Sequence, residues 1–141
     1  MTLEEAWSFF SDPNNLSTIT PGNLRFEAVY PLPHVIYPGL VLVYRLRPMF
    51  NIPTTWVTEI THVREPSLFV DEQRMGPYRL WHHEHHFRAI EGGVEIEDLV
   101  HYALPFGPLG LIAENMLVRS TLNEIFGFRA RVLKERFGTL D

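Results

Sequence analysis

The sequence predicts an α+β fold in which a curved antiparallel sheet of about six strands packs on a long C-terminal helix. Three observations predict it: two short helical patterns open the chain, segments rich in β-branched and aromatic residues follow, and apolar residues at helical spacing close it. With 141 residues, of which 45% are hydrophobic, the chain has the size and composition of a single domain over 1–141.

The N-terminal residues predict two short helices. Thr2 is followed three residues later by Glu5, which is a capping-box pattern, and the apolar residues of the next turns give this helix one apolar face. We expect the helix to end near Ser11. Asp12-Pro13 can then cap a second short helix that runs through Leu16.

The middle of the chain predicts β-strands. Segments rich in Val, Ile, Thr, Tyr, Phe and Trp are separated here by Pro and Gly. The turn Glu91-Gly92-Gly93 suits a tight hairpin because glycine tolerates positive φ angles, so we expect neighbouring strands to pair antiparallel. The expected strands are Leu24–Tyr30, Leu40–Arg47, Thr54–Arg64, Leu68–Met75, Tyr78–Ile90 and Val94–Leu104.

The C-terminal part predicts one long amphipathic helix. Apolar residues recur at helical spacing from Leu111 to Leu133, and Gly138 is the expected C-cap. The helix would cover about 25 residues, or about 38 Å at 1.5 Å per residue, which is long enough to lie along the open face of the sheet.

Residues 81–87 carry the strongest functional signal, because they read Trp-His-His-Glu-His-His-Phe and hold four of the seven histidines. Alternate side chains of a strand point to opposite faces, so Trp81, His83, His85 and Phe87 share one face. Large apolar surface combined with two imidazoles suits the wall of a pocket for an amphipathic organic molecule.

Two imidazoles on an inward face need polar partners, because a buried polar group without a hydrogen bond costs about 1 to 3 kcal/mol. Across a two-residue hairpin, Asp98 lies opposite His85 or Phe87, depending on register. Asp71 and Gln73 are further candidate partners. These groups either contact a ligand or form a satisfied polar network inside the core.

Arg129 lies on the apolar stripe of the last helix, where an arginine needs an anionic partner such as Asp98 or a ligand carboxylate. Several aromatic residues either line a pocket or simply pack in the core. The candidate ligand-binding residues are Trp56, Asp71, Gln73, Trp81, His83, His85, Phe87, Asp98, Tyr102, Phe106 and Arg129, and the candidate catalytic residues among them are His83, His85 and Asp98.

The opposite face of the same strand has the residue types of a two-histidine, one-carboxylate metal site in His82, Glu84 and His86. The two outer histidines would lie about 13 Å apart along a strand, which is too far for one ion. We expect them to pair across strands with Glu95 or Glu97 instead.

The inner histidines are closer to each other, and His83 and His85 could share a metal with Asp98. We nevertheless expect neither a metal nor another cofactor. The chain has no cysteine, which excludes disulfides, thiolate catalysis and thiolate metal sites. No phosphate-binding glycine loop, serine nucleophile elbow or dinucleotide fingerprint is present, which disfavours kinases, hydrolases and dehydrogenases.

Charge and hydropathy narrow the class of partner. Twelve basic against seventeen acidic residues give a net charge of −5, which argues against a nucleic-acid partner. No apolar run reaches the roughly 20 residues that span a bilayer, and the N-terminus lacks a signal-peptide pattern. We therefore expect a soluble cytoplasmic protein.

The order of elements, with Trp81-x-His83-x-His85-x-Phe87 and the stretch from Asp98 to Gly110, resembles the helix-grip superfamily of START domains, birch-pollen-type allergens and polyketide cyclases. The resemblance is closest to a bacterial branch of SRPBCC proteins, through motifs in Trp7 to Leu16, Phe69 to Tyr78 and Ile125 to Arg129. It covers nearly the whole chain. It implies a sheet that grips the final helix around a tunnel for an apolar or amphipathic small molecule.

One departure from that superfamily concerns the first strand. Its members usually begin with a β-strand, whereas here the helix pattern starts at Thr2, so we expect the usual first strand to be absent. An uncovered sheet edge invites pairing with another copy. We therefore expect a homodimer through this edge or an unusually open pocket.

The expected function is non-catalytic binding of a hydrophobic or amphipathic small molecule, lipid- or polyketide-like, between the sheet and the last helix. The first alternative is a cyclase or dehydratase in which His83 or His85 acts as general base and Asp98 or Arg129 orients the substrate. The second alternative is an interaction domain whose pocket is vestigial.

Overall fold

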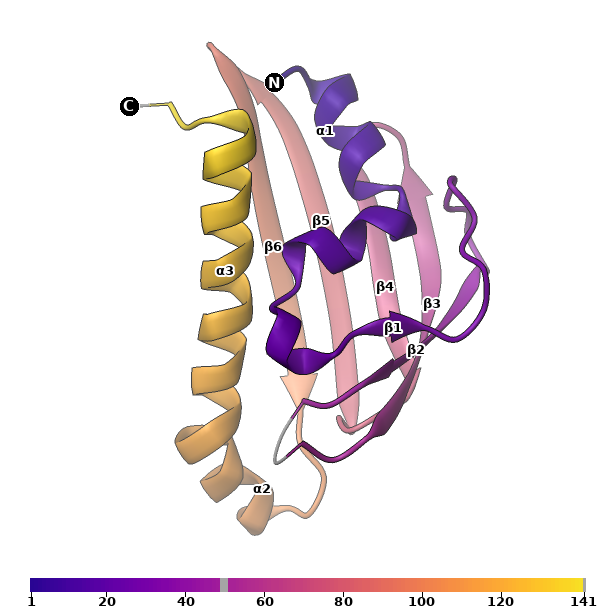
Figure 1. Ribbon diagram of the computed structural model, residues 1–141, viewed down its shortest axis with the longest axis vertical. Coiled ribbons are helices and arrows are strands. Elements are labelled where there is room, and N and C mark those ends of the chain that lie inside the picture. The colour runs from indigo at the N-terminus through magenta and orange to yellow at the C-terminus, as the bar shows by residue number, and fades with distance from the viewer. Residues whose placement is uncertain (49–50, 141) are drawn as a thin grey trace.

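The computed structural model describes residues 1–48 and 51–140, and it confirms the α+β class (Figure 1). Six strands form one open antiparallel sheet in which the spatial order follows the chain order. The strands are β1 (Glu27–Ala28), β2 (Val41–Leu46), β3 (Thr54–Arg64), β4 (Leu68–Met75), β5 (Leu80–Ile90) and β6 (Gly93–Ala103).

The predicted capping box begins the first helix, α1 (Leu3–Phe10). The Glu5 N–H donates to the Thr2 hydroxyl at 3.2 Å, and the Thr2 N–H donates to the Glu5 carboxylate at 2.7 Å. The predicted second helix is a 3-10 helix, η1 (Pro13–Ile19), which extends beyond Leu16. Both elements lie in front of the sheet in Figure 1.

The first strand is shorter than predicted. Instead of running over Leu24–Tyr30, it consists of β1 alone, because Leu24 ends a 3-10 turn, η2 (Gly22–Leu24). The next residue, Arg25, has a left-handed backbone with φ of 48°, which is incompatible with an extended strand. The chain therefore enters the sheet only after this turn.

The β5–β6 hairpin has the expected two-residue loop. Ile90 pairs with Gly93, and Gly92 adopts a φ of 83°, which glycine accepts without strain. This loop sets the register that places His85 opposite Asp98. Of the two partners that the sequence left open for Asp98, the structure selects His85.

The C-terminal helical segment is interrupted near its start. It consists of α2 (Pro108–Ala113), a π-helical turn η3 (Glu114–Val118) and α3 (Arg119–Phe137). The predicted C-cap is confirmed, since the Gly138 N–H donates to the carbonyl of Lys134 at 2.9 Å. The 19 residues of α3 extend for about 28 Å along the sheet beside β6 (Figure 1).

Both α1 and α3 pack on the face of the sheet that carries the odd-numbered residues of β5. At one end, the Trp7 ring of α1 makes edge contacts with Phe69 and Phe87 at 5.9 and 5.8 Å between centroids. At the other end, Leu122 of α3 packs in a cluster with Trp81. His83 and His85 lie on β5 between Phe87 of the first hydrophobic cluster and Trp81 of the second.

β6 forms one edge of the sheet, and in residues 1–48 no strand precedes α1. Among the described residues, no helix combines the length and the hydropathy that a membrane crossing requires.

Candidate functional site

A cavity of about 200 Å³ lies between the inner face of the sheet, the N-terminal helices and α3. Its walls are mostly apolar, and aromatic side chains come from helices, strands and the segments between them, among them Phe9, Phe26, Tyr44, Trp56, Tyr78 and Phe126. Its lining also includes a group of ionisable side chains that lie together: Asp71, His83, His85 and Arg129. We call these four residues, together with Asp98 behind the imidazoles, the polar floor.

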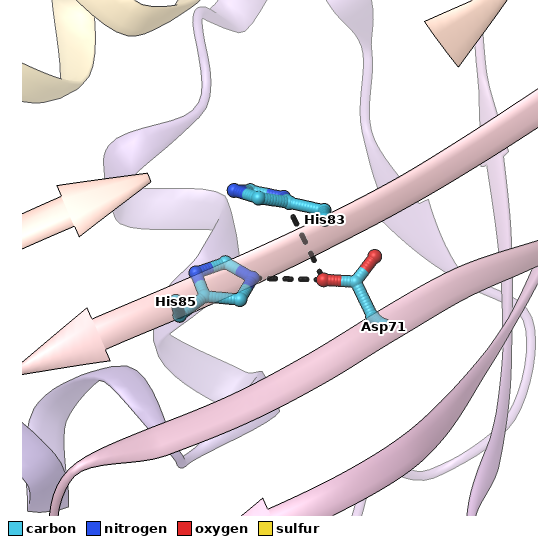
Figure 2. Close-up of side chains that lie close together, drawn as sticks. All are labelled: Asp71, His83 and His85. Atoms are coloured by element: carbon cyan, nitrogen blue, oxygen red, sulfur yellow. Dashed lines mark hydrogen bonds and ion pairs between the residues drawn. The ribbon is translucent and has the colours of Figure 1, made fainter. Parts of the chain in front are cut away.

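Two neighbouring strands position the centre of the polar floor (Figure 2). Side chains of β5 alternate, so His83 and His85 face inward and are 4% and 7% exposed. On β4, Asp71 is the register partner of His83. Figure 2 shows both imidazoles turned toward the Asp71 carboxylate.

Each inner imidazole lies between two carboxylates. His85 Nε2 is 2.8 Å from Asp71 Oδ2, and His83 Nδ1 is 3.6 Å from the same oxygen. On the other side, Asp98 Oδ1 is 2.8 Å from His83 Nε2 and 3.1 Å from His85 Nδ1, although the latter pair is not aligned as a hydrogen bond. The two rings are in tilted contact, with centroids 3.8 Å apart and planes inclined by 36°, so the four groups form one electrostatic unit.

The last helix closes this unit. Arg129 of α3 is buried, and its Nη1 donates to Asp98 Oδ1 at 3.4 Å, so the structure shows the first of the two anionic partners that the sequence left open. Its guanidinium also lies over the Phe126 ring, 5.1 Å from the centroid. Four elements thus contribute to the polar floor: β4 supplies Asp71, β5 supplies His83 and His85, β6 supplies Asp98 and α3 supplies Arg129.

Burial and pairing shift the pKa values of the polar floor. Burial opposes ionisation of both carboxyl groups, yet the neighbouring imidazoles and Arg129 hold the pKa of Asp71 and that of Asp98 below the usual range. Burial lowers the pKa of His83, and the charge of His85 lowers it further. Burial also opposes protonation of His85, but the two carboxylates raise its pKa. The pKa values of the two imidazoles are therefore shifted in opposite directions.

Three polar atoms of cavity-lining residues, within the described part of the chain, are buried without a hydrogen-bond partner: the Tyr44 hydroxyl, Arg129 Nε and His85 Nδ1. Tyr44 is 2% exposed, and burial together with the Asp71 charge raises the pKa of its hydroxyl. Buried polar groups in folded proteins are nearly always paired with protein, water or ligand. The Tyr44 hydroxyl and Arg129 Nε therefore each keep a donor without a partner among the described residues, whereas His85 Nδ1 lies 3.1 Å from Asp98 Oδ1.

Six of the predicted site residues line the cavity, namely Trp56, Asp71, Trp81, His83, His85 and Arg129. Asp98 does not line it, but it holds both imidazoles and Arg129 from behind. Gln73 makes no hydrogen bond to the imidazoles. Its side-chain amide instead donates to the Tyr78 carbonyl at 2.7 Å and accepts from the Tyr78 N–H at 3.1 Å.

The remaining aromatic candidates lie outside the cavity wall. Phe87 is 3% exposed and packs in the core against Trp7. Tyr102 packs against Trp81 and Tyr78 at the other end of the sheet. Phe106 is 81% exposed, because the turn before α2 gives it a φ of 72° and directs its ring away from the sheet. For Phe87 the core alternative is therefore the observed one.

Two cavity-lining residues were not predicted from the sequence: Tyr44, the only tyrosine of β2, and Thr58 of the adjacent strand β3. Thr58 donates its hydroxyl to the Glu72 carbonyl at 3.1 Å and lies 3.4 Å from Asp71 Oδ1. The signal for Tyr44 was the two-residue period of β2, in which Leu42, Tyr44 and Leu46 are all buried.

The outer face of β5 has a separate network. The Glu84 carboxylate lies between two histidines, 3.2 Å from His82 Nε2 and 2.7 Å from His86 Nε2. His82 Nδ1 also contacts the Glu72 carboxylate of β4 at 2.7 Å, and this hydrogen bond raises the pKa of His82. Of the two glutamates predicted as cross-strand partners, Glu97 is the register partner of His86, but the hydrogen bonds of the outer histidines go to Glu72 of β4 and Glu84 of β5.

No protein-family model and no curated protein matches the chain. Three solved structures share its fold. Protein Ms6760 from Mycobacterium smegmatis is 18% identical with a TM-score of 0.65, over 96% of this chain and 85% of that one. TTHA0849 from Thermus thermophilus is 16% identical with a TM-score of 0.70, over 96% of this chain and 88% of that one.

The third structure is the nucleoside-diphosphate sugar epimerase from Corynebacterium glutamicum, which is 19% identical with a TM-score of 0.65. The likeness covers 96% of this chain but only 26% of the epimerase. At such identities the three structures establish the fold alone. They agree with an α+β arrangement of an antiparallel sheet and a C-terminal helix, which is consistent with a helix-grip fold.

Proposed function

We propose that this protein binds a small amphipathic molecule in the cavity between the sheet and α3. One observation carries the proposal: a mostly apolar cavity of about 200 Å³ contains buried polar atoms that have no partner in the described part of the protein. An engineered apolar cavity of about 150 Å³ binds benzene. The cavity of this protein, at about 200 Å³, is larger and therefore accommodates at least a one-ring compound.

The polar atoms define the end of the ligand that meets them. The Tyr44 hydroxyl and Arg129 Nε both carry a hydrogen that needs an acceptor. The ligand accordingly places a hydroxyl, carbonyl or carboxylate oxygen at the polar floor. Its apolar body contacts the rings of Trp56, Trp81 and Phe126, as a lipid- or polyketide-like compound would.

We further propose that the chain is a helix-grip protein of the SRPBCC, or START-like, kind. The sequence motifs support this, and so does the order of elements, in which a C-terminal helix packs on an antiparallel sheet. The same likeness supports ligand binding between sheet and helix as the function.

The test is recovery of a bound compound from purified protein, by native mass spectrometry and solvent extraction, followed by a thermal-shift screen of one- and two-ring amphiphiles. For any binder, Tyr44→Phe removes one buried hydroxyl and should weaken the affinity about fivefold, which corresponds to about 1 kcal/mol. Tyr30→Phe is the matched control because Tyr30 is 67% exposed. If no compound is recovered and none shifts the melting temperature, the binding proposal fails, and the interaction-domain alternative gains support.

One observation favours a second candidate, an enzyme of the cyclase or dehydratase kind. Two imidazoles in contact have pKa values shifted in opposite directions, and such splitting is typical of an acid and a base in one site. In this alternative His83, the less basic ring, is the general base. Conversion of a recovered ligand that is lost in His83→Gln but kept in His86→Gln, on the outer face, would support it.

We also propose that two copies associate through β6. This strand of 11 residues forms one edge of the sheet, and its outward main-chain groups can pair with a second strand. Analytical ultracentrifugation tests the proposal. A dimer at tens of micromolar supports it, and a clean monomer at the same concentration contradicts it.

A further inference from the structure

We propose that Asp71, His83 and His85 bind a divalent first-row transition-metal ion through a carboxylate oxygen, His83 Nδ1 and His85 Nε2. From the sequence alone we expected no metal, and Asp98 was the only carboxylate considered as a metal ligand beside these histidines. The inference goes beyond the proposed binding of an organic molecule and does not depend on it.

The first argument is the distance between the three ligand atoms (Figure 2). One ligand atom from each of the three residues lies within 4.8 Å of the other two, and Asp71 Oδ2 is 2.8 Å from His85 Nε2 and 3.6 Å from His83 Nδ1. Two atoms bound at about 2.1 Å to one ion lie about 3.0 Å apart at a right angle and about 3.4 Å apart at a tetrahedral angle. The two distances from Asp71 Oδ2 to the imidazole nitrogens are thus close to the spacing of ligands around a single ion.

The second argument is a count of protons. Four imidazole nitrogens face carboxylate oxygens, at 2.8, 2.8, 3.1 and 3.6 Å. Ionised carboxylates only accept hydrogen bonds, and a neutral imidazole carries one N–H. Two neutral rings would leave two nitrogen lone pairs aimed at carboxylates, and one neutral ring beside one protonated ring would still leave one. Two doubly protonated rings would place two buried cations 3.8 Å apart.

A bound cation removes this conflict. If His83 Nδ1 and His85 Nε2 coordinate the ion, each ring keeps one N–H: that of His83 Nε2 donates to Asp98, and that of His85 Nδ1 lies 3.1 Å from the same oxygen, outside hydrogen-bond alignment. Metal-bound histidines commonly donate their other N–H to a carboxylate, which sets the tautomer and the ring orientation. Asp98 is placed for this role, since Oδ1 lies 2.8 Å from His83 Nε2 and 3.1 Å from His85 Nδ1, and Arg129 holds it at 3.4 Å.

The third argument is the surroundings of the ligand set. All three ligands line the cavity, so coordination positions beyond the protein ligands are accessible to water or to a bound molecule. The Tyr44 hydroxyl is buried in the same cavity, without a partner among the described residues, and can bond to a metal-bound oxygen. Two histidines and one carboxylate with open positions are typical of Fe²⁺ and Zn²⁺ sites.

The test uses full-length protein that has been treated with chelator and dialysed. Zn²⁺ is titrated by isothermal calorimetry, and Co²⁺ is followed by its visible absorption. We expect one equivalent per chain. Asp71→Asn should weaken binding by at least about 100-fold, and Asp98→Asn, which alters only the supporting carboxylate, by about 10- to 100-fold. His82→Ala and His86→Ala, on the outer face, should bind like the wild type.

A second measurement avoids variants that fail to fold. In the wild type, histidine side-chain NMR during a Zn²⁺ titration should show shifts at His83 and His85, with the outer rings unchanged. Shifts confined to His82 and His86 would overturn the proposal. So would the absence of saturable uptake of Zn²⁺ and Co²⁺ by folded wild-type protein, or an Asp71→Asn protein that binds as tightly as the wild type.

Discussion

The two faces of β5 carry the same chemistry in different surroundings. On the inner face, the side chains of His83 and His85 are 6% and 9% exposed and share two carboxylates from different strands. On the outer face, the side chains of His82 and His86 are 28% and 38% exposed and share Glu84 of their own strand. By residue type alone the two faces are alike, since each offers two histidines and a carboxylate.

The difference shows that burial and convergence, rather than composition, decide how strongly neighbouring charged groups depend on one another. Outer charges are solvated, so each ion pair there contributes little to stability, typically less than about 1 kcal/mol. Inner charges have lost their water and depend on each other, so removal of one partner leaves an unpaired buried charge. Neighbouring residues of β5 therefore contribute very differently to the free energy of unfolding.

The largest expected effect comes from removing an apolar core side chain, rather than a polar one, from the inner face of β5. Phe87→Ala should lower the free energy of unfolding by about 3 to 5 kcal/mol, because it opens a cavity in the core beside Trp7. Urea denaturation measures this. Phe106→Ala is the control, because Phe106 is 81% exposed and its loss should change stability by less than about 0.5 kcal/mol. Equal effects would contradict the assignment of Phe87 to the core.

The next effect compares two carboxylates that each contact two imidazoles. Asp98→Ala should cost about 3 kcal/mol of unfolding free energy, because it leaves Arg129 and the inner imidazoles without their counter-charge. Glu84→Ala should cost at most about 1 kcal/mol, because its pairs are solvated. Both values follow from urea unfolding of the two variants. If the costs are the same, the distinction between the faces is lost.

A smaller effect tests the role of the helix in the polar floor. Arg129→Lys keeps the positive charge but loses the planar guanidinium that spans Asp98 and the Phe126 ring, and we expect about 1 to 2 kcal/mol of destabilisation. Arg131→Lys, on the exposed side of α3, is the matched control. Thermal unfolding followed by circular dichroism compares them. A loss in Arg131→Lys as large as that in Arg129→Lys would contradict the inward role.

The smallest effect concerns the outer histidines. His86→Ala removes one contact to Glu84 and should change stability by less than about 1 kcal/mol, with the difference shrinking as salt is added. Unfolding at low and high ionic strength measures it. A cost above about 2 kcal/mol that persists in high salt would show that the outer network is as strongly coupled as the inner one.

Local patterns predicted much of this fold. The capping box at Thr2, the hairpin at Gly92 and the C-cap at Gly138 are confirmed, because each depends on residues within a few positions of one another. The expected strand over Leu24–Tyr30 was wrong over most of its length, because a 3-10 turn and the left-handed Arg25 precede β1. The π-helical turn before α3 had no signal in the spacing of apolar residues.

Parity along β5 was enough to direct His83 and His85 inward, and the hairpin placed Asp98 opposite His85. Parity says which face a side chain occupies, but not which groups of that face meet. The contact of Asp71 with both imidazoles depends on the β4–β5 register. The closure of the site by Arg129 depends on where α3 crosses the sheet. Such contacts join residues far apart in the chain, and long-range packing selects them.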